Sequence, residues 1–185
     1  MGISFAWTAV EGLSAADALS RLSLGPTEKT CVFPSNAVAS HVLPKQWLMF
    51  AAGSCNHRII SSDSMAALSR GCQAVACAIE EHVGFSLAEL WRDGEQVWQV
   101  EYAADRSDVL RWSGTLPDRF EALHAAAEPD DSDNLEGIFL MDIPLMMAKD
   151  VAGYRHDEND PVFDATPFQV LADLRPKRPW WKLWP

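Results

Sequence analysis

The pattern of apolar and polar positions over residues 85–102 predicts a β-hairpin. Two runs in which apolar and polar residues alternate flank Asp93-Gly94, a dipeptide that favours a tight two-residue turn. A two-residue loop pairs Trp91 with Gln96 and places Glu89 opposite Trp98. Because alternate residues of a strand share a face, the buried face is expected to carry Phe85, Leu87, Trp91, Trp98, Val100 and Tyr102. We place this hairpin in the middle of the sheet.

A carboxylate among aromatic rings needs a partner or a raised pKa. Glu89 is therefore expected near the sheet edge, where it reaches water or a basic side chain.

The remaining pattern predicts further strands and helices. Short runs rich in apolar and β-branched residues predict strands over residues 3–10, 47–52, 72–83 and 109–113. Residues 72–83 also fit a helix, and we prefer a strand because the segment leads into the hairpin. A capping box from Ser14 to Asp17 begins a helix that Gly25-Pro26 should stop. Further helices are expected over residues 64–70, 117–127 and 142–152, the last with Asp142 as N-cap and Gly153 as C-cap, whereas residues 26–46 look irregular.

These elements predict an α+β fold with a single central, largely antiparallel sheet and three to four helices packed on it. No repeat or second core interrupts the pattern, so we expect one domain over residues 1–174. Residues 128–136 hold five acids and no base, which predicts a solvated loop. Residues 175–185 form a basic, Trp-rich tail. Its interleaved cations and tryptophans suit a membrane interface or a docking peptide, or a tail folded onto its own acidic body.

Composition narrows the classes of function. The chain has 185 residues, is 48% hydrophobic and lacks a long apolar run or a signal peptide, so we expect no transmembrane segment and a cytoplasmic location. The net charge is −11, and the tail contributes +4 of it, which leaves −15 on the rest. Such an acidic surface repels phosphate backbones, so we expect no nucleic-acid partner. It is compatible with solubility alone or with docking to a basic protein.

The sequence has no motif of a common catalytic or cofactor site. The phosphate-binding, dinucleotide-binding, zinc-protease and nucleophile-elbow patterns are all missing. The four cysteines are irregularly spaced and no two form a C-x-x-C pair, so we expect free thiols, no metal and no cofactor.

Three clusters of polar residues are candidates for a site. Cys55 and His57 could form a nucleophile and base, although residues two apart rarely present their side chains to each other. In Glu80-Glu81-His82, Glu80 and His82 would share a strand face as an acid–imidazole pair or as two metal ligands, or the cluster is simply solvent-facing. The segment Tyr154-Arg155-His156-Asp157 follows a helix and either terminates it or presents a pocket rim. We expect Arg155 or His156 to pair with a carboxylate, with Asp157, Glu80 and Glu81 as candidates.

Four segments together resemble a family of small bacterial proteins of no known activity. They are FAW-x-AV at 5–10, EEH at 80–82, W-x-D-G-x-x-x-W at 91–98 and GYRHD at 153–157. The resemblance covers most of the chain except the tail and implies a bacterial origin. It implies no function, and it ranks the GYRHD segment above the other two candidates.

The leading hypothesis is a non-enzymatic cytoplasmic protein-binding module, such as an immunity- or antitoxin-type inhibitor of a basic partner. The candidate binding residues are Glu80, Glu81, His82, Tyr154, Arg155, His156 and Asp157. The alternative is a small hydrolase or metal-dependent enzyme that uses His82, His156 and nearby carboxylates. An enzyme should bring the EEH and GYRHD segments into one concave pocket, whereas a binding protein can leave them apart.

Overall fold

A computed structural model of the chain describes residues 2–128, 137–158 and 166–176. Within these ranges the α+β prediction is confirmed, because four helices pack against one large antiparallel sheet. Residues 129–136 and 177–185 lie outside the described residues. The predictions of an acidic loop and of a basic tail therefore fall almost entirely outside them.

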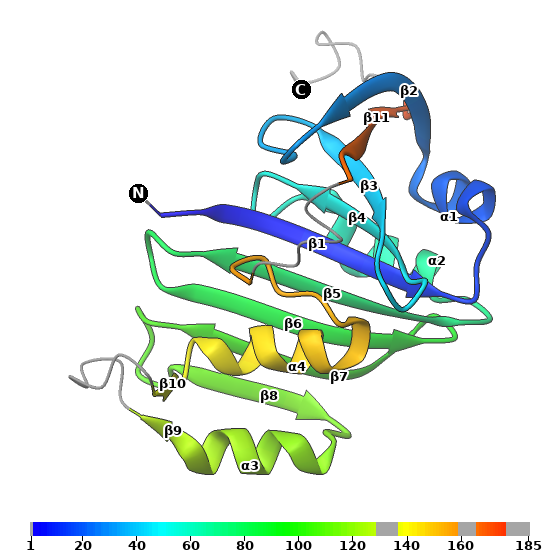
Figure 1. Cartoon of the computed structure of the whole chain (residues 1–185). Coiled ribbons are helices and arrows are strands. Elements are labelled where there is room, and N and C mark those ends of the chain that lie inside the picture. The colour runs from blue at the N-terminus through cyan, green and yellow to red at the C-terminus, as the bar shows by residue number, and fades with distance from the viewer. Residues whose placement is uncertain (1, 129–136, 159–165, 177–185) are drawn as a thin grey trace, which may run out of the picture.

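Nine of the described strands form one sheet in which every neighbouring pair is antiparallel. Their spatial order is β2-β11-β3-β4-β1-β5-β6-β7-β8 (Figure 1). The strands are β1 (Ser4–Glu11), β2 (Leu24–Cys31), β3 (Val38–Val42), β4 (Leu48–Ala52), β5 (Gln73–Glu80), β6 (Phe85–Arg92), β7 (Glu95–Ala103), β8 (Leu110–Gly114) and β11 (Phe168–Asp173). Two short parallel strands, β9 (Ala127–Glu128) and β10 (Ile138–Phe139), form a separate pair.

The centre of the sheet is β1 and not the hairpin of β6 and β7. The hairpin lies toward the β8 edge, so the prediction of a central hairpin is wrong. The first strand is central because it pairs with β4 on one side and with β5 over its whole length on the other. Six of its eight residues are buried, as a strand covered on both faces requires.

Helices cover both faces of the sheet. One face packs against α4 (Asp142–Ala152), which lies across β5, β6 and β7 and contacts α3 (Asp118–Ala126) (Figure 1). The other face packs against α2 (Ser62–Leu68), the short 3-10 helix η1 (Arg58–Ile60) and α1 (Ala15–Leu22). The Ser14 side chain accepts a hydrogen bond from the Asp17 amide, which confirms the predicted helix start.

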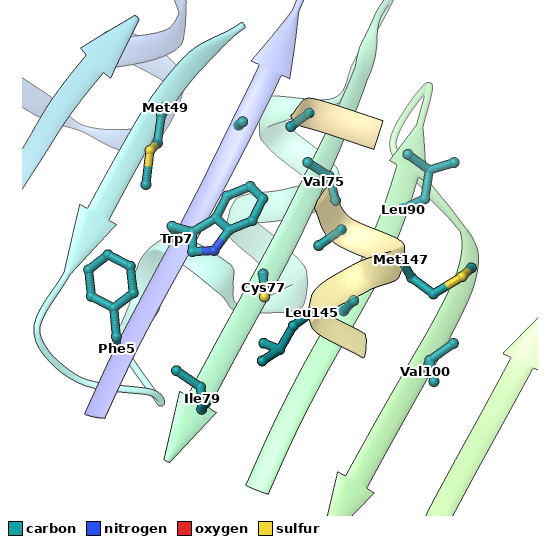
Figure 2. Close-up of a cluster of buried hydrophobic side chains, with 14 of the residues drawn as sticks. Phe5, Trp7, Met49, Val75, Cys77, Ile79, Leu90, Val100, Leu145 and Met147 are labelled. Carbon is teal, nitrogen blue, oxygen red and sulfur yellow. The ribbon is translucent and has the colours of Figure 1, made fainter. Parts of the chain in front are cut away.

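Alternation along the strands divides the core into two clusters. In β5, Val75, Cys77 and Ile79 point to the α4 face, whereas Ala74 and Ala76 point to the α1 and α2 face. The preference for a strand over a helix within residues 72–83 is therefore confirmed. Figure 2 shows the α4 face, where side chains of β1 and β5 lie on the same side of the sheet as the helix. Ala74 and Ala76 are thus small residues on the face that packs against α2.

The hairpin turns at Asp93-Gly94 as predicted, with both residues at positive φ and Arg92 paired with Glu95. The predicted pairing of Trp91 with Gln96 is also confirmed, but the predicted register is wrong beyond that pair. A β-bulge separates the Trp91–Gln96 pair from the next pair, Leu90 with Trp98, and Val97 is the extra residue. Trp91 and Trp98 are both buried, but they belong to opposite faces of the sheet.

The same bulge moves Glu89 away from Trp98. Glu89 pairs with Gln99 and is only 7% exposed. Its carboxylate accepts a hydrogen bond from the Trp91 indole Nε1 at 2.7 Å. Burial raises its pKa above the ordinary range of a glutamic acid. The expectation of a solvated or cation-paired Glu89 near the sheet edge is therefore wrong.

The segment that looked irregular contains two strands. Residues 26–46 include most of β2 and all of β3, and β2 begins within two residues of the end of α1. The helix ends at Leu22 because Ser23 adopts the left-handed conformation, whereas Gly25 and Pro26 already lie in β2. Pro26 is tolerated there because β2 is an edge strand of the described sheet.

Candidate functional site

The GYRHD segment begins where α4 ends and runs back along the helix (Figure 1). Gly153 has φ 79° and donates its amide to the Lys149 carbonyl, which confirms the predicted C-cap. The left-handed residue reverses the direction of the chain. Arg155 therefore reaches Asp142 at the opposite end of α4. At the helix start the structure corrects one prediction, because Met141 is the N-cap and Asp142 is the first helical residue.

Arg155 joins two carboxylates. Its Nε and Nη2 donate to the two oxygens of Asp157 at 2.7 and 2.9 Å, and Nη2 also donates to Asp142. The predicted pairing of Arg155 with Asp157 is confirmed, whereas Asp142 was not among the candidates. Burial by itself raises the pKa of Asp157, but the hydrogen bonds and the charge of Arg155 outweigh it and hold the pKa below the usual value.

His156 is the most enclosed residue of the segment. Its side chain is 4% exposed, and its Nδ1 lies 3.9 Å from an Asp157 oxygen. Its Nε2 has no hydrogen-bond partner among the described residues. Burial lowers the pKa of His156, so the imidazole is neutral at pH 7, although nearby carboxylates led by Asp157 oppose the shift.

Tyr154 anchors the segment to the core. Its ring meets the Trp7 indole edge to face, with centroids 5.3 Å apart and an interplanar angle of 86°. Trp7 is 2% exposed and belongs to the central strand β1. Such pairs add about 0.5–1.5 kcal/mol beyond the buried area. The contact fixes the backbone immediately before Arg155.

These residues border a cavity of about 480 Å³, which we name the Arg155 cavity. Its polar lining is Glu81, Asp142, Arg155, His156 and Asp157. Its other lining residues are Ile79, Gly84, Tyr102, Ala104, Phe139, Met141 and Leu145. Three carboxylates and one guanidinium give this lining a formal charge of −2 with His156 neutral. The one guanidinium already donates to two of the three carboxylates.

The EEH segment meets the GYRHD segment only in part. Glu81 lines the Arg155 cavity, and its Oε2 accepts a hydrogen bond from the Ile3 amide at 2.8 Å. Glu80 lines a different cavity and accepts from His82 Nδ1 at 2.6 Å. A hydrogen bond from Ser4 and a second from His82 lower the pKa of Glu80. The predicted Glu80–His82 pair is thus present, on an exposed imidazole that does not line the Arg155 cavity.

Cys55 and His57 both line the second cavity, which has a volume of about 580 Å³ and which we name the Cys55 cavity. His57 Nδ1 accepts a hydrogen bond from the Ile59 amide at 3.3 Å. That bond occupies the Nδ1 lone pair, and burial lowers the pKa of the ring. His57 is thus the N-cap of the helix η1.

Asp142 is the site residue that sequence reasoning missed. It was interpreted as a helix cap alone, and its carboxylate does accept from the Phe139 amide at 3.1 Å. The signal that could have found it is the position of Arg155 two residues after the predicted C-cap, with Asp142 at the start of the same helix. An arginine two residues after a left-handed C-cap can fold back to the start of a three-turn helix.

The described residues hold no group of three His, Cys, Asp or Glu side chains arranged to bind a metal ion. Over the same parts of the chain, none of the helices combines the length and the apolar character needed to cross a bilayer. In comparisons with known proteins, no family model, no curated protein and no solved structure matches the chain.

Proposed function

We propose that the protein is a non-enzymatic, cytoplasmic module that binds a basic protein partner, in the manner of an immunity- or antitoxin-type inhibitor of bacterial origin. The observation that carries this proposal is the lining of the Arg155 cavity. Three carboxylates border it, and its one guanidinium is already engaged by two of them. The excess negative charge is therefore not compensated within this lining and can attract a cation.

The charge of the whole chain supports the same partner. A net charge of −11 raises the rate of encounter with a basic protein and disfavours acidic competitors. Carboxylates on an exposed rim act mainly on the association rate, because the approaching partner senses them before contact.

The placement of the two histidines favours binding over catalysis. An enzyme that used both rings would need them in one cavity. His156 borders the Arg155 cavity, whereas His82 is exposed, pairs with Glu80 and is not part of that lining. Arg155 is likewise occupied by Asp142 and Asp157 and so is not poised for a reacting group.

The proposal is tested by isolating a partner from cells that encode the chain and measuring association against salt. The full chain serves as bait beside two charge-reversal variants, Glu81→Lys at the cavity and Glu28→Lys on the edge strand β2. Both variants change the net charge equally, so a difference between them reports position. We expect a basic protein whose association rate falls steeply between low and physiological salt and falls further for Glu81→Lys. An acidic partner, or association that is insensitive to salt, would remove the proposal.

A further inference from the structure

We propose that the Arg155 cavity receives a lysine side chain of the basic partner. This inference rests on the proposed function and specifies how the partner is recognised. A lysine combines a long aliphatic stem with a compact cationic head. The cavity presents both kinds of surface, one along its apolar wall and one at its polar rim.

The apolar wall suits the stem. Ile79 comes from the end of β5, Tyr102 from β7 and Leu145 from the first turn of α4. Lysine stems pack along apolar surface while the charged end stays among polar groups. The volume of about 480 Å³ lies within the range of about 300–1,000 Å³ over which protein cavities hold small ligands.

The polar rim offers acceptors for the head. Glu81 uses one carboxylate oxygen for the Ile3 amide, which leaves Oε1 for an incoming donor. Asp157 keeps a side chain that is 44% exposed. An ammonium group has three N–H donors and no acceptor, so it matches a rim made of acceptors.

His156 supplies an independent reason to expect a donor. Its side chain is 4% exposed and Nε2 has no partner among the described residues. With the ring proton on Nδ1, which faces Asp157, Nε2 carries a lone pair. Buried polar atoms are nearly always hydrogen-bonded, so this unpaired acceptor beside the cavity marks a place where a donor is missing.

Lysine fits this rim better than arginine. An arginine binds carboxylates through a planar pair of parallel N–H donors. Asp157 already spends both oxygens on such a pair with Arg155, and Glu81 has only one oxygen without a backbone partner. The remaining acceptors are separate single atoms, which a rotating ammonium group can satisfy and a rigid fork cannot.

The test is an NMR titration of the full chain with the capped tripeptide acetyl-Gly-Lys-Gly-amide. The arginine and norleucine tripeptides are the comparison, because norleucine keeps an aliphatic stem without the charge. We expect saturable shifts for the lysine peptide at the amides of Ile79, Glu81, Gly84 and Tyr102, and weaker binding of the other two. Shifts scattered over the exposed acids, or equal binding of norleucine or arginine, would overturn the proposal.

Two pairs of variants locate the binding. Glu81→Gln keeps an oxygen for the Ile3 amide and removes the charge, whereas Glu28→Gln removes the same charge from β2. We expect Glu81→Gln to weaken lysine binding roughly threefold to tenfold and Glu28→Gln to leave it nearly unchanged. Ala104 lines the cavity, so Ala104→Lys should fill it and block the peptide, whereas Ser107→Lys in the same loop should not. If the two variants of either pair changed peptide binding equally, the lysine would not bind in the Arg155 cavity.

The peptide titration is independent of the partner experiment. If the tripeptide fails while a basic partner still associates in a salt-dependent way, only the lysine inference is lost. If the tripeptide binds as expected and no basic partner exists, the proposed function is lost and the cavity remains a lysine site for another ligand.

Discussion

At the scale of single residues, Arg155 connects the start of α4 with the segment that follows its end. It follows the C-cap of the helix, it donates to Asp142 at the first residue of the helix, and it holds the loop residue Asp157. Its side chain is only 15% exposed. Removing such a group leaves two carboxylates in a partly buried place without their counter-charge.

Arg155→Ala is therefore expected to lower the free energy of unfolding by about 2–4 kcal/mol. The matched control is Arg119→Ala, which breaks a half-exposed pair with Asp150 and should cost less than about 1 kcal/mol. Denaturant titration of both variants gives the comparison. Equal losses would show that Arg155 is an ordinary surface cation.

Glu89 provides a prediction about pH. Its folded-state pKa is raised by burial, so the folded protein binds this proton more tightly than the unfolded chain does. The stability that it contributes is present below the unfolded pKa and is lost as the pH rises through the folded pKa. Glu89→Gln keeps an acceptor for the Trp91 indole and removes the charge. We expect it to raise the melting temperature at pH 7.5, with the gain vanishing near pH 4.

The matched variant is Glu95→Gln, an exposed glutamate next to the turn of the same hairpin. It should leave the melting temperature unchanged at both pH values. A Glu89→Gln gain that persists at pH 4 would mean that the effect does not come from ionisation.

The residues of the candidate site could be predicted only where the partners are near in sequence. The pair of Arg155 with Asp157 spans two residues and was expected. The pair with Asp142 depends on the path of the chain after Gly153, and the separation of Glu80 from Glu81 depends on which side of the sheet each faces. The pair with Asp142 needs the tertiary placement of the segment after α4, whereas strand alternation alone points neighbouring residues such as Glu80 and Glu81 to opposite sides.

At the scale of elements, the β-bulge of the hairpin is what the alternating pattern could not reveal. An inserted residue changes the face of every later residue of its strand. Val97 is that residue, and its carbonyl accepts from the Thr115 amide at 2.9 Å just beyond β8. The bulge is thus stabilised by a strand that comes later in the chain. The polar strand β2 was missed for a related reason, since an edge strand needs no apolar alternation.

Gly114 makes the approach of the bulge to β8 possible. It has φ 82°, and a Cβ atom there would lie 2.1 Å from the Val97 carbonyl oxygen. Gly71 has a similar φ of 69° but no atom within 4 Å of the Cβ position. We expect Gly71→Ala to cost about 1–2 kcal/mol from backbone strain alone.

Gly114→Ala adds steric overlap with backbone to the same strain and should cost about 2–5 kcal/mol. Chemical denaturation of the two variants measures the difference. Similar costs would show that β8 can move away from the bulge without loss, and that the hairpin register does not depend on it.

At the scale of the whole molecule, the order of the sheet was beyond sequence reasoning although the fold class was not. Strand content, helix caps and the antiparallel turn at Asp93-Gly94 are local features, and they predict an α+β fold. The order places β11, from the end of the described chain, between β2 and β3 near its beginning. That pairing joins residues about 140 positions apart, such as Gln169 and Thr30. No local pattern encodes such a contact.

Two C-terminal deletions of different length test whether β11 and the tail each contribute to the stability of the sheet. Phe168 and Leu171 of β11 are buried, whereas Leu174, Arg175 and Pro176 are exposed. Arg175 forms an ion pair with Asp173 on the surface.

Deleting residues 176–185 should therefore lower the melting temperature by less than about 4 °C, because the strand and its pairing stay intact. Deleting residues 168–185 removes a strand from inside the sheet and exposes two edges, so this variant should not fold. Thermal melts followed by circular dichroism distinguish the two deletions. A large loss in the shorter deletion would show that the basic tail packs on the acidic body and stabilises it, which is the alternative that its four cations allow.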